Sequence, residues 1–334
     1  MSDRGQRPHR GPGIALMSQA ALVAGDWGTS HLRLFLCQED GTVMAALDGP
    51  GAADVAGDFP ETLDTLLRGW TREYGSLPVV LCGMVGSSLG WRQAPYLPCP
   101  ARPEQIAQAC VGLRDGLVHI VPGLSCRNRL NAPDVLRGEE TQILGALRLN
   151  PALSSGRQLL CLPGTHTKWV LLEDGCVREF LTAPTGELFA VLCEHSILVN
   201  DERQRQDLHA AIDGPAFDHG LMQIQRFPAA GVLHRLFECR SRRLTGDLHS
   251  DEAMPLLSGM LIASDVQGAV RLFATSAART SVQLIGATRL AALYARALVS
   301  QDCDTNVIDG SLASLNGLLQ VHRLLSQQAV ANDG

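Results

Sequence analysis

The sequence has few aromatic residues, little excess of either charge and no long hydrophobic run, and each shortage excludes a class of protein. Phe, Trp and Tyr make up 4% of the 334 residues, while 46% are hydrophobic and 19% are charged. This composition is typical of a globular protein and excludes collagen, coiled coils and wholesale disorder. No window approaches 18 consecutive apolar residues, so we expect no membrane span and no membrane partner.

Positive charge is also scarce. The chain has 28 Lys and Arg against 34 Asp and Glu, which gives a net charge of −6. Nucleic-acid binding requires clustered basic residues, so we expect no nucleic-acid partner. A small anionic ligand remains compatible with this balance, because it needs only a few local donors.

Closely spaced cysteines are missing, although ten cysteines are present. No two of them are closer than eleven residues, which excludes a C-x-x-C motif and the spacing of a zinc ribbon. Residues 1–20 lack the uninterrupted apolar segment of a secretory signal, and we expect them to form a flexible tail. Together these features predict free thiols in a cytoplasmic protein.

Several familiar catalytic signatures are absent as well. The chain contains no G-x-x-x-x-G-K-[ST], no G-x-G-x-x-G after a strand, no H-E-x-x-H and no G-x-S-x-G. What remains is Asp-Trp-Gly-Thr-Ser at Asp26–Ser30, between two segments that we expect to be strands, residues 21–25 and 31–37.

This turn has the chemistry of a phosphate site. Gly28 lets the backbone approach a phosphate, and the hydroxyl groups of Thr29 and Ser30 can donate to its oxygens. The carboxylate of Asp26 can hold Mg²⁺, usually through water. The alternative is an ordinary hairpin turn, in which Asp and Gly are common.

The pattern occurs twice. Gly164-Thr165 again precedes an apolar strand and a Glu-Asp-Gly turn, as Gly28-Thr29 does. We therefore predict two α/β domains, residues 21–150 and 151–334, whose Gly-Thr turns clamp one polyphosphate. A closing helix is expected over residues 312–325, with the option of packing back on the first domain.

Longer motifs carry a resemblance to a known family. They are DWGTS-HLR (26–33), CGMVGSSLGWRQAPYLPCPA (82–101), VPGL (121–124), DVLRGEETQILGAL (134–147), LPGTHTKWV (162–170), TGELFAVLCEHS (185–196), LSGMLI (257–262) and IGATRLAALYARAL (285–298). In these stretches the chain resembles the 2-dehydro-3-deoxygalactonokinase family of the sugar kinase/actin/heat-shock-70 superfamily. Two departures from the family pattern are His31 and Pro184.

The resemblance implies both fold and activity. The fold would be two duplicated actin-like (ribonuclease H-like) domains around a nucleotide-binding cleft. The activity would be ATP-dependent phosphorylation of the terminal hydroxyl of 2-dehydro-3-deoxy-D-galactonate to the 6-phosphate, in galactonate catabolism, with Mg²⁺. Galactonate and gluconate derivatives are not distinguished by these motifs, and a homodimer is one option for the assembly.

Candidate catalytic residues lie in the Arg-Gly-Glu-Glu block. Glu139 or Glu140 is expected to serve as the base for the sugar hydroxyl, and Arg137 to lie over the transferred charge, with Asp26 as the fourth catalytic residue. Asp134 is the next candidate base. Adjacent residues diverge by ~100° around a helix, so only one Glu can face the cleft. The alternative is a helix N-terminus, where paired acids favourably meet the helix dipole.

Further contacts follow from the same motifs. The nucleotide would contact Asp26, Gly28, Thr29, Ser30, Gly164, Thr165 and Gly286, with Asp26 as the metal ligand. The sugar acid would contact Arg33, Gly83, Gly86, Ser87, Trp91, Tyr96, His166, Lys168 and Glu187, with Arg33 and Lys168 as candidates for its carboxylate. Residues 83–100 are expected to be a long loop that forms the sugar pocket, or alternatively an aromatic plug. A lone Lys168 could equally be a solvated strand residue.

Two other function classes remain open on the same fold. A nucleoside-triphosphate or polyphosphate phosphohydrolase would need a catalytic water in place of the sugar pocket. A non-catalytic actin-like binding protein would need no acidic base, and both glutamates would then be free to face solvent.

Overall fold

The computed structural model describes residues 19–55, 57–199, 213–273 and 280–332. Of the tail expected at residues 1–20, only residues 19 and 20 fall in this range. Within it, the ten cysteines are free and most are buried, so the prediction of free thiols is confirmed.

Two large sheets carry the duplication. The first has the order β3-β2-β1-β4-β7-β6 and the second β12-β11-β10-β13-β14. Their bounds are β1 Ala20–Trp27, β2 His31–Gln38, β3 Val43–Pro50, β4 Val79–Gly83, β6 Val111–Leu113, β7 Val118–Ile120, β10 Arg157–Leu162, β11 Thr167–Glu173, β12 Cys176–Ala183, β13 Ser281–Gly286 and β14 Asp304–Asp309.

The five shared strands match in direction as well as in order. The hairpins β1-β2-β3 and β10-β11-β12 are antiparallel, and β4 and β13 pair parallel to β1 and β10. Two unrelated sheets would not be expected to agree in the order and direction of five strands. The fold is therefore two duplicated actin-like domains, as predicted. The boundary between residues 150 and 151 stays a prediction.

A third, smaller sheet joins the two halves. Its order is β5-β8-β9, with β5 at Tyr96–Pro98, β8 at Gly123–Arg127 and β9 at Pro133–Leu136. Just after β5, Ala101 pairs with Val177 of β12 in the second sheet. The segment expected as a loop over residues 83–100 therefore contains β5 and the short helix η1 (Met84–Gly86). Strands of three to five residues are too short to show a period in the sequence.

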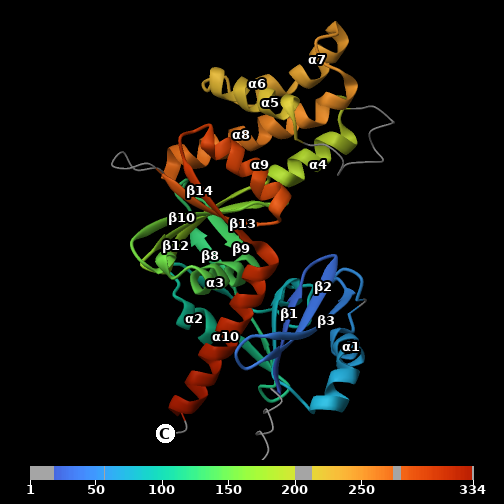
Figure 1. Ribbon diagram of the computed structural model, residues 1–334, viewed down its shortest axis with the longest axis vertical. Coiled ribbons are helices and arrows are strands. Elements are labelled where there is room, and N and C mark those ends of the chain that lie inside the picture. Colours follow the sequence, from blue (N-terminus) through green and yellow to red (C-terminus); the bar gives the residue numbers. More distant parts are fainter. Residues whose placement is uncertain (1–18, 56, 200–212, 274–279, 333–334) are drawn as a thin grey trace, which may run out of the picture.

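The remaining helices cover the sheets. They are α1 Phe59–Tyr74, α2 Pro103–Gln108, η2 Pro151–Ser154, α4 Thr185–His195, α5 Pro215–Arg226, α6 Leu233–Leu236, α7 Glu238–Thr245, η3 Ser250–Glu252, α8 Ala253–Phe273 and α9 Thr288–Val299. Figure 1 shows α4 to α9 gathered over the second sheet and α1 beside the first. The segment Ser250–Phe273 is apolar and long enough to cross a membrane, but 72% of its apolar 18-residue stretch is buried inside the protein, so α8 is a core helix.

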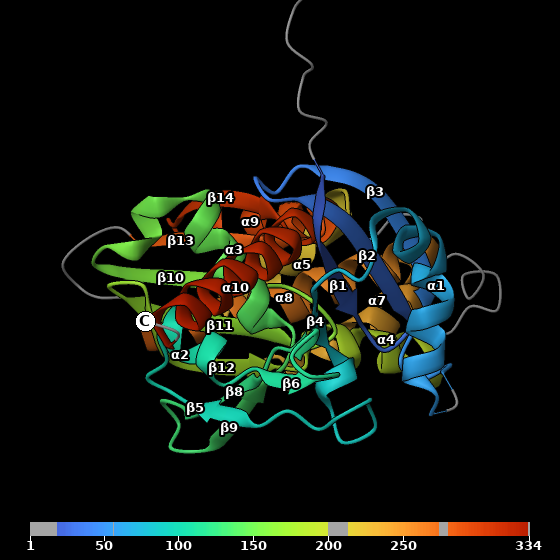
Figure 2. The same ribbon diagram turned by 90° about the horizontal axis from the view of Figure 1, so that it is seen from below.

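Helices α3 (Glu139–Leu149) and α10 (Gly310–Asn332) pack between the two sheets (Figure 2). Their backbones touch at two glycines. A Cβ at Gly145 would lie 1.8 Å from the carbonyl oxygen of Ala313, and one at Gly317 would lie 1.9 Å from that of Thr141. Strands of both sheets and both helices share one hydrophobic cluster. The helix that follows the last strand of the second half thus packs on α3 of the first half.

Candidate functional site

The first Gly-Thr turn connects β1 to β2 and is held by the main chain. The N–H of Ala52 donates to the carbonyl of Gly28 at 2.9 Å, and that of Ala53 donates to the carbonyl of Thr29 at 3.0 Å. Thr29 and Ser30 are exposed. The loop after β3 therefore fixes the turn while its hydroxyl groups stay open to a ligand.

Asp26 lies at the end of β1, next to the start of α10. Burial raises the pKa of Asp26, while hydrogen bonds from Ser314 and Cys82 and the charge of Arg33 lower it by less. A Cβ at Gly83 would lie 3.5 Å from Asp26 Oδ1. The carboxylate is thus only partly covered and lies where β1, β4 and α10 meet.

Arg33 lies on β2, opposite Asp26 in the antiparallel register. Its Nη1 donates to the hydroxyl of Ser311 on α10 at 2.8 Å, and the side chain is exposed. Both charged groups at the end of the first hairpin therefore contact the first turn of α10.

The second Gly-Thr turn connects β10 to β11 and packs against the start of α4. The N–H of Glu187 donates to the carbonyl of Thr165 at 2.9 Å. A Cβ at Gly186 would lie 2.5 Å from the carbonyl oxygen of Gly164, so only glycine allows this approach. His166 Nε2 and Glu187 Oε2 are 2.8 Å apart, and both side chains are about half exposed.

A buried hydrogen-bond network supports this second turn. Asp265 of α8 accepts from Trp169 Nε1 at 2.8 Å and from the hydroxyl groups of Thr185 and Tyr294, each at 2.7 Å. Thr167, which follows the turn, contacts the Tyr294 hydroxyl at 2.7 Å. Burial raises the pKa of Asp265, and these hydrogen bonds oppose the rise. The network fixes β11, α4 and α9 to α8.

Sequence reasoning did not find Asp265. The available signal is that it is the one acidic residue within an otherwise apolar helix over residues 253–273. A carboxylate in such a helix needs several donors to be buried.

A small apolar cavity of about 60 Å³ lies beside the second turn, between α4, α8 and α9. Its lining includes Gly164, Gly186, Phe189 and Ile262. Gly286, at the end of β13, lies nearby: a Cβ there would be 3.4 Å from the carbonyl oxygen of Pro163. The second half thus offers apolar surface directly beside its Gly-Thr turn.

The two glutamates at the start of α3 have different surroundings. Glu139 is partly exposed, and its Oε2 accepts from the N–H of Arg137 at 3.0 Å. Burial raises its pKa, and the charges of Lys168 and His166 in the second half lower it by less. The Glu139 carboxylate therefore holds the turn before α3 while the residue stays partly exposed.

Glu140 is completely buried. It accepts from the N–H of Gly138 at 2.7 Å and from the hydroxyl of Thr141 at 3.1 Å. Burial raises its pKa to about 8, with a smaller contribution from the charge of Glu139. Of the two acids, only Glu139 is placed to meet a ligand.

Lys168 and Asp134 are held by contacts between the third sheet and the second half. Lys168, the single lysine of the sequence, is 5% exposed, and its Nζ donates to the Val135 carbonyl at 3.1 Å and the Thr182 hydroxyl at 2.9 Å. Asp134 accepts from the N–H of Thr182 at 2.9 Å and from its hydroxyl at 2.6 Å. These contacts tie the third sheet to β11 and β12. The geometry therefore does not favour the carboxylate contact expected of Lys168, nor Asp134 as the next candidate base.

The guanidinium of Arg137 also differs from expectation. Its Nη2 donates to the carbonyl of Ala94 at 2.8 Å, and its centre lies 4.4 Å from the ring centre of Tyr96. A Cβ at Gly86 would lie 2.9 Å from Nη1. The side chain thus supports the segment 83–100, while its buried Nε and Nη1 have no hydrogen-bond partner among the described residues, and its expected role over the phosphoryl group stays a prediction.

Trp91 and Ser87 are likewise engaged within that segment. The Trp91 ring packs against the core of the first half, with the guanidinium of Arg114 5.2 Å from its centre. The hydroxyl of Ser87 accepts from the N–H of Leu89 at 3.2 Å. For Trp91 the geometry favours the alternative of an aromatic plug.

The remaining candidates are contiguous. A Cβ at Gly138 would lie 3.6 Å from the Cα of Gly83, which itself borders Asp26. Glu139 follows Gly138 and interacts electrostatically with His166, which follows the second Gly-Thr turn. Asp26 and Glu139 therefore lie close together in the first half, where the resemblance leads us to expect the nucleotide-binding cleft.

Comparisons with known proteins identify the family of this chain. Residues 26–321 match the model of the 2-keto-3-deoxy-galactonokinase family. A Rhizobium meliloti (strain 1021) protein named as a probable 2-dehydro-3-deoxygalactonokinase is 36% identical over 91% of this chain and 97% of its own length. The 2-dehydro-3-deoxygalactonokinase of Escherichia coli (strain K12) is 33% identical over 94% of this chain and 99% of its own.

A solved structure extends the match to three dimensions. The crystal structure of a 2-dehydro-3-deoxygalactonokinase protein from Sinorhizobium meliloti superposes with a TM-score of 0.78 at 34% identity, and covers 90% of this chain and 98% of that one. The family model begins at Asp26, at the end of β1, and ends within α10, so it spans both halves. The resemblance drawn from the motifs is confirmed, and this chain belongs to the 2-keto-3-deoxy-galactonokinase family.

Proposed function

We propose that the chain transfers the γ-phosphoryl group of ATP to the terminal hydroxyl of 2-dehydro-3-deoxy-D-galactonate and forms the 6-phosphate. Family membership supports this activity. The observation that carries the mechanism is the position of Glu139: a partly exposed carboxylate that follows Gly138, which packs against Gly83 beside Asp26. An actin-like binding protein has no need of such an acid in its cleft.

The nucleotide binds between the two turns. The exposed hydroxyl groups of Thr29 and Ser30 and the backbone of Gly164 and Thr165 hold its phosphates. The apolar cavity between α4, α8 and α9 lies beside the second turn and receives part of the base, with Gly286 next to it. This assignment places the γ-phosphate near Asp26 and Glu139.

Glu139 acts as the general base. As the substrate oxygen bonds to the γ-phosphorus and the bond to ADP breaks, its proton passes to the Glu139 carboxylate. Burial raises the pKa of Glu139, which makes the carboxylate a stronger proton acceptor than a solvated one. Glu140 has no access to the substrate and holds the turn at Gly138.

Asp26 is suited to Mg²⁺ held with the nucleotide. Among the described residues no group of three His, Cys, Asp or Glu side chains could hold a metal ion. Magnesium fits a site with the single carboxylate of Asp26, because it keeps several waters and commonly takes one or two carboxylates beside phosphate oxygens. When bound, the ion neutralises charge on the phosphates.

Arg33 is the remaining candidate for the substrate carboxylate, since Lys168 is buried. We also propose that the enzyme works in the cytoplasm.

A coupled assay for ADP release tests the proposal. The wild-type chain and Glu139→Gln are each assayed with Mg-ATP and 2-dehydro-3-deoxy-D-galactonate, its gluconate epimer, neutral sugars and no acceptor. We expect ADP release that requires a keto sugar acid and is lost in the variant. Equal release without an acceptor would identify a phosphohydrolase, and equal turnover of a neutral sugar would overturn the need for a carboxylate.

A further inference from the structure

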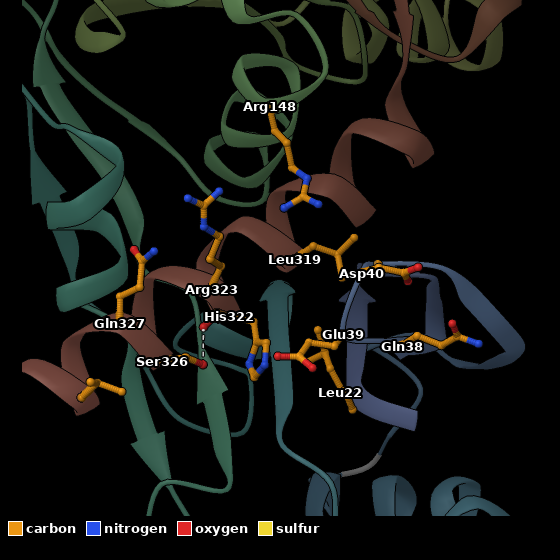
Figure 3. Close-up of a pocket in the computed structure, with 13 residues that line it drawn as sticks. Leu22, Gln38, Glu39, Asp40, Arg148, Leu319, His322, Arg323, Ser326 and Gln327 are labelled. Atoms are coloured by element: carbon orange, nitrogen blue, oxygen red, sulfur yellow. Dashed lines mark hydrogen bonds between the residues drawn. The ribbon is translucent and has the colours of Figure 1, made fainter. Parts of the chain in front are cut away.

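A cavity of about 610 Å³ opens between the β2–β3 turn and the C-terminal half of α10 (Figure 3). It is lined by Ala21, Leu22, Gln38, Glu39, Asp40, Gly41, Arg148, Leu319, His322, Arg323, Ser326, Gln327 and Val330. Ala21 lies at the start of β1 and Asp26 at its end, so the cavity is on the order of 15 Å from the catalytic carboxylate. It is therefore separate from the cleft described above.

Two free cations line one part of this cavity. Arg148 comes from the last turn of α3 and Arg323 from α10, and both are exposed. Within the described part of the chain, neither side chain has a hydrogen bond or an ion pair. In Figure 3 both guanidinium groups lie above Glu39. The same two arginines line a neighbouring cavity of about 410 Å³, so open space adjoins them on two sides. Two unpaired guanidinium groups in such a place favour a phosphate, which they can bind in a bidentate manner.

Hydrogen-bond acceptors line another part of this cavity. The side chain of Glu39 makes no hydrogen bond or ion pair with the described residues, and that of Asp40 accepts from the N–H of Thr42 at 2.8 Å. Gln38, Gln327 and Ser326 add further polar groups, whereas Leu22 and Leu319 are apolar. Carboxylates and amides bind the hydroxyl groups of sugars, and apolar side chains pack against the C–H face of a sugar ring. A ligand that carries a phosphate at one end and hydroxyl groups at the other would match both parts of the cavity, and a phosphorylated sugar is such a ligand.

Helix α10 connects this cavity to the catalytic cleft. Its first turns contact Arg33 through Ser311 and Asp26 through Ser314, and its later turns present His322 and Arg323 to the cavity. At 1.5 Å per residue, Ser314 and Arg323 are about 14 Å apart along one continuous helix. A ligand that shifts or restrains α10 therefore alters the contacts of Asp26 and Arg33.

We propose that this cavity is a regulatory site for a phosphorylated sugar, held by Arg148 and Arg323, whose occupancy changes catalysis through α10. Only the kinetic consequence depends on the proposed kinase function, because binding itself can be measured without turnover.

Binding is tested by calorimetry on the full chain. A non-hydrolysable ATP analogue with Mg²⁺ is present at saturation, so that the two Gly-Thr turns are filled. Glucose 6-phosphate, glucose and inorganic phosphate are titrated into the wild type, into Arg148→Gln/Arg323→Gln and into Arg68→Gln/Arg72→Gln. The last variant is the matched control, because it removes two exposed arginines of α1 and changes the net charge equally.

We expect glucose 6-phosphate to bind the wild type and the control equally, and at least about tenfold more weakly to Arg148→Gln/Arg323→Gln, which loses two charge-assisted contacts. Glucose should not bind, and inorganic phosphate should bind more weakly than the sugar phosphate. Failure of all three probes to bind the wild type, or equal binding to both double variants, would overturn the site. Equal affinity for inorganic phosphate would overturn the sugar component.

The kinetic arm uses the same three proteins. Saturating glucose 6-phosphate should change kcat or the KM for ATP severalfold in the wild type and the control, but not in Arg148→Gln/Arg323→Gln. Specific binding without any kinetic change would overturn the regulatory role. Absence of kinase activity in all three proteins, with binding intact, would contradict the proposed kinase function and leave the binding site established.

Discussion

The two Gly-Thr turns occupy equivalent places in duplicated sheets, yet different contacts hold them. Backbone hydrogen bonds from Ala52 and Ala53 fix the first turn. The second turn rests on α4 and, below it, on a network of side chains around the buried Asp265. The first arrangement depends on the backbone and on Gly51, where a Cβ would lie 2.2 Å from the carbonyl oxygen of Thr29, whereas the second depends on one carboxylate.

The two halves also differ in the chemistry that they bring to the cleft. The first half provides Asp26 and Glu139, both carboxylates whose pKa is raised by burial. The second half provides His166 and Glu187, paired and half exposed, beside a small apolar cavity. The two halves have therefore diverged: the candidate catalytic carboxylates lie on the first half, and a half-exposed His–Glu pair beside an apolar cavity lies on the second. Changes to the first half should lower kcat, and changes to the second should raise KM.

The largest effect is expected from Asp26→Asn. The amide cannot replace a charged ligand of Mg²⁺, so kcat should fall to about one thousandth or less. The melting temperature should not fall, since the change removes a charge whose burial raises its pKa. Asp115→Asn, at an exposed turn, is the matched control. Activity of Asp26→Asn within tenfold of the wild type would contradict the assignment.

The next largest effect should separate the adjacent glutamates. Glu139→Gln retains the shape of the side chain and removes the base, so kcat should fall by about 10²-fold. Glu140→Gln alters a side chain with no access to the cleft and should change the melting temperature more than kcat. Steady-state kinetics and thermal unfolding of both variants decide the matter. Two equal, mild effects on kcat would mean that neither glutamate is the base and that the pair only stabilises the start of α3.

Glu140 should also shape the dependence of stability on pH. Its pKa in the folded protein is raised to about 8 from an ordinary value of 4.5, so the folded state binds its proton more tightly. The stabilisation is complete below the ordinary pKa and is lost as the pH rises towards 8. We expect the melting temperature to fall between pH 5 and pH 8.5, and to fall less in Glu140→Gln. Glu104→Gln, an exposed change, should follow the wild type. Parallel curves for all three proteins would contradict this account.

A smaller effect, on nucleotide binding, should follow Asp265→Asn. An amide cannot accept all three hydrogen bonds from Trp169, Thr185 and Tyr294, so α4 and the second turn should lose their fixed position. The KM for ATP should rise by about three- to tenfold, with a smaller change in kcat. The exposed change Asp251→Asn serves as the control. A lower melting temperature with an unchanged KM would make Asp265 a purely structural residue.

The limits of sequence reasoning follow from the same residues. The hairpins after Asp26 and around Gly164 were predictable, because turn residues and apolar alternation lie next to one another in the chain. The third sheet was missed, because Tyr96–Pro98 shows no period and finds its partners only through the fold. Likewise, the burial of Lys168 depends on Val135 and Thr182, which are distant in sequence. Local sequence patterns therefore located the turns. Whether each candidate residue is buried or open to a ligand depended on contacts that form only on folding.

The smallest effect is expected at the histidines that follow the two turns. His31 is exposed, and its Nδ1 contacts only the carbonyl of Ser30, at 3.2 Å. His166 contacts Glu187 and influences the pKa of Glu139. His31→Asn should therefore change kcat and both KM values by less than about twofold, because an exposed contact of this kind contributes little. His166→Asn should raise the KM for the sugar acid severalfold. Kinetics of the two variants with both substrates measure the difference, and a larger effect from His31 would reverse the division of roles between the halves.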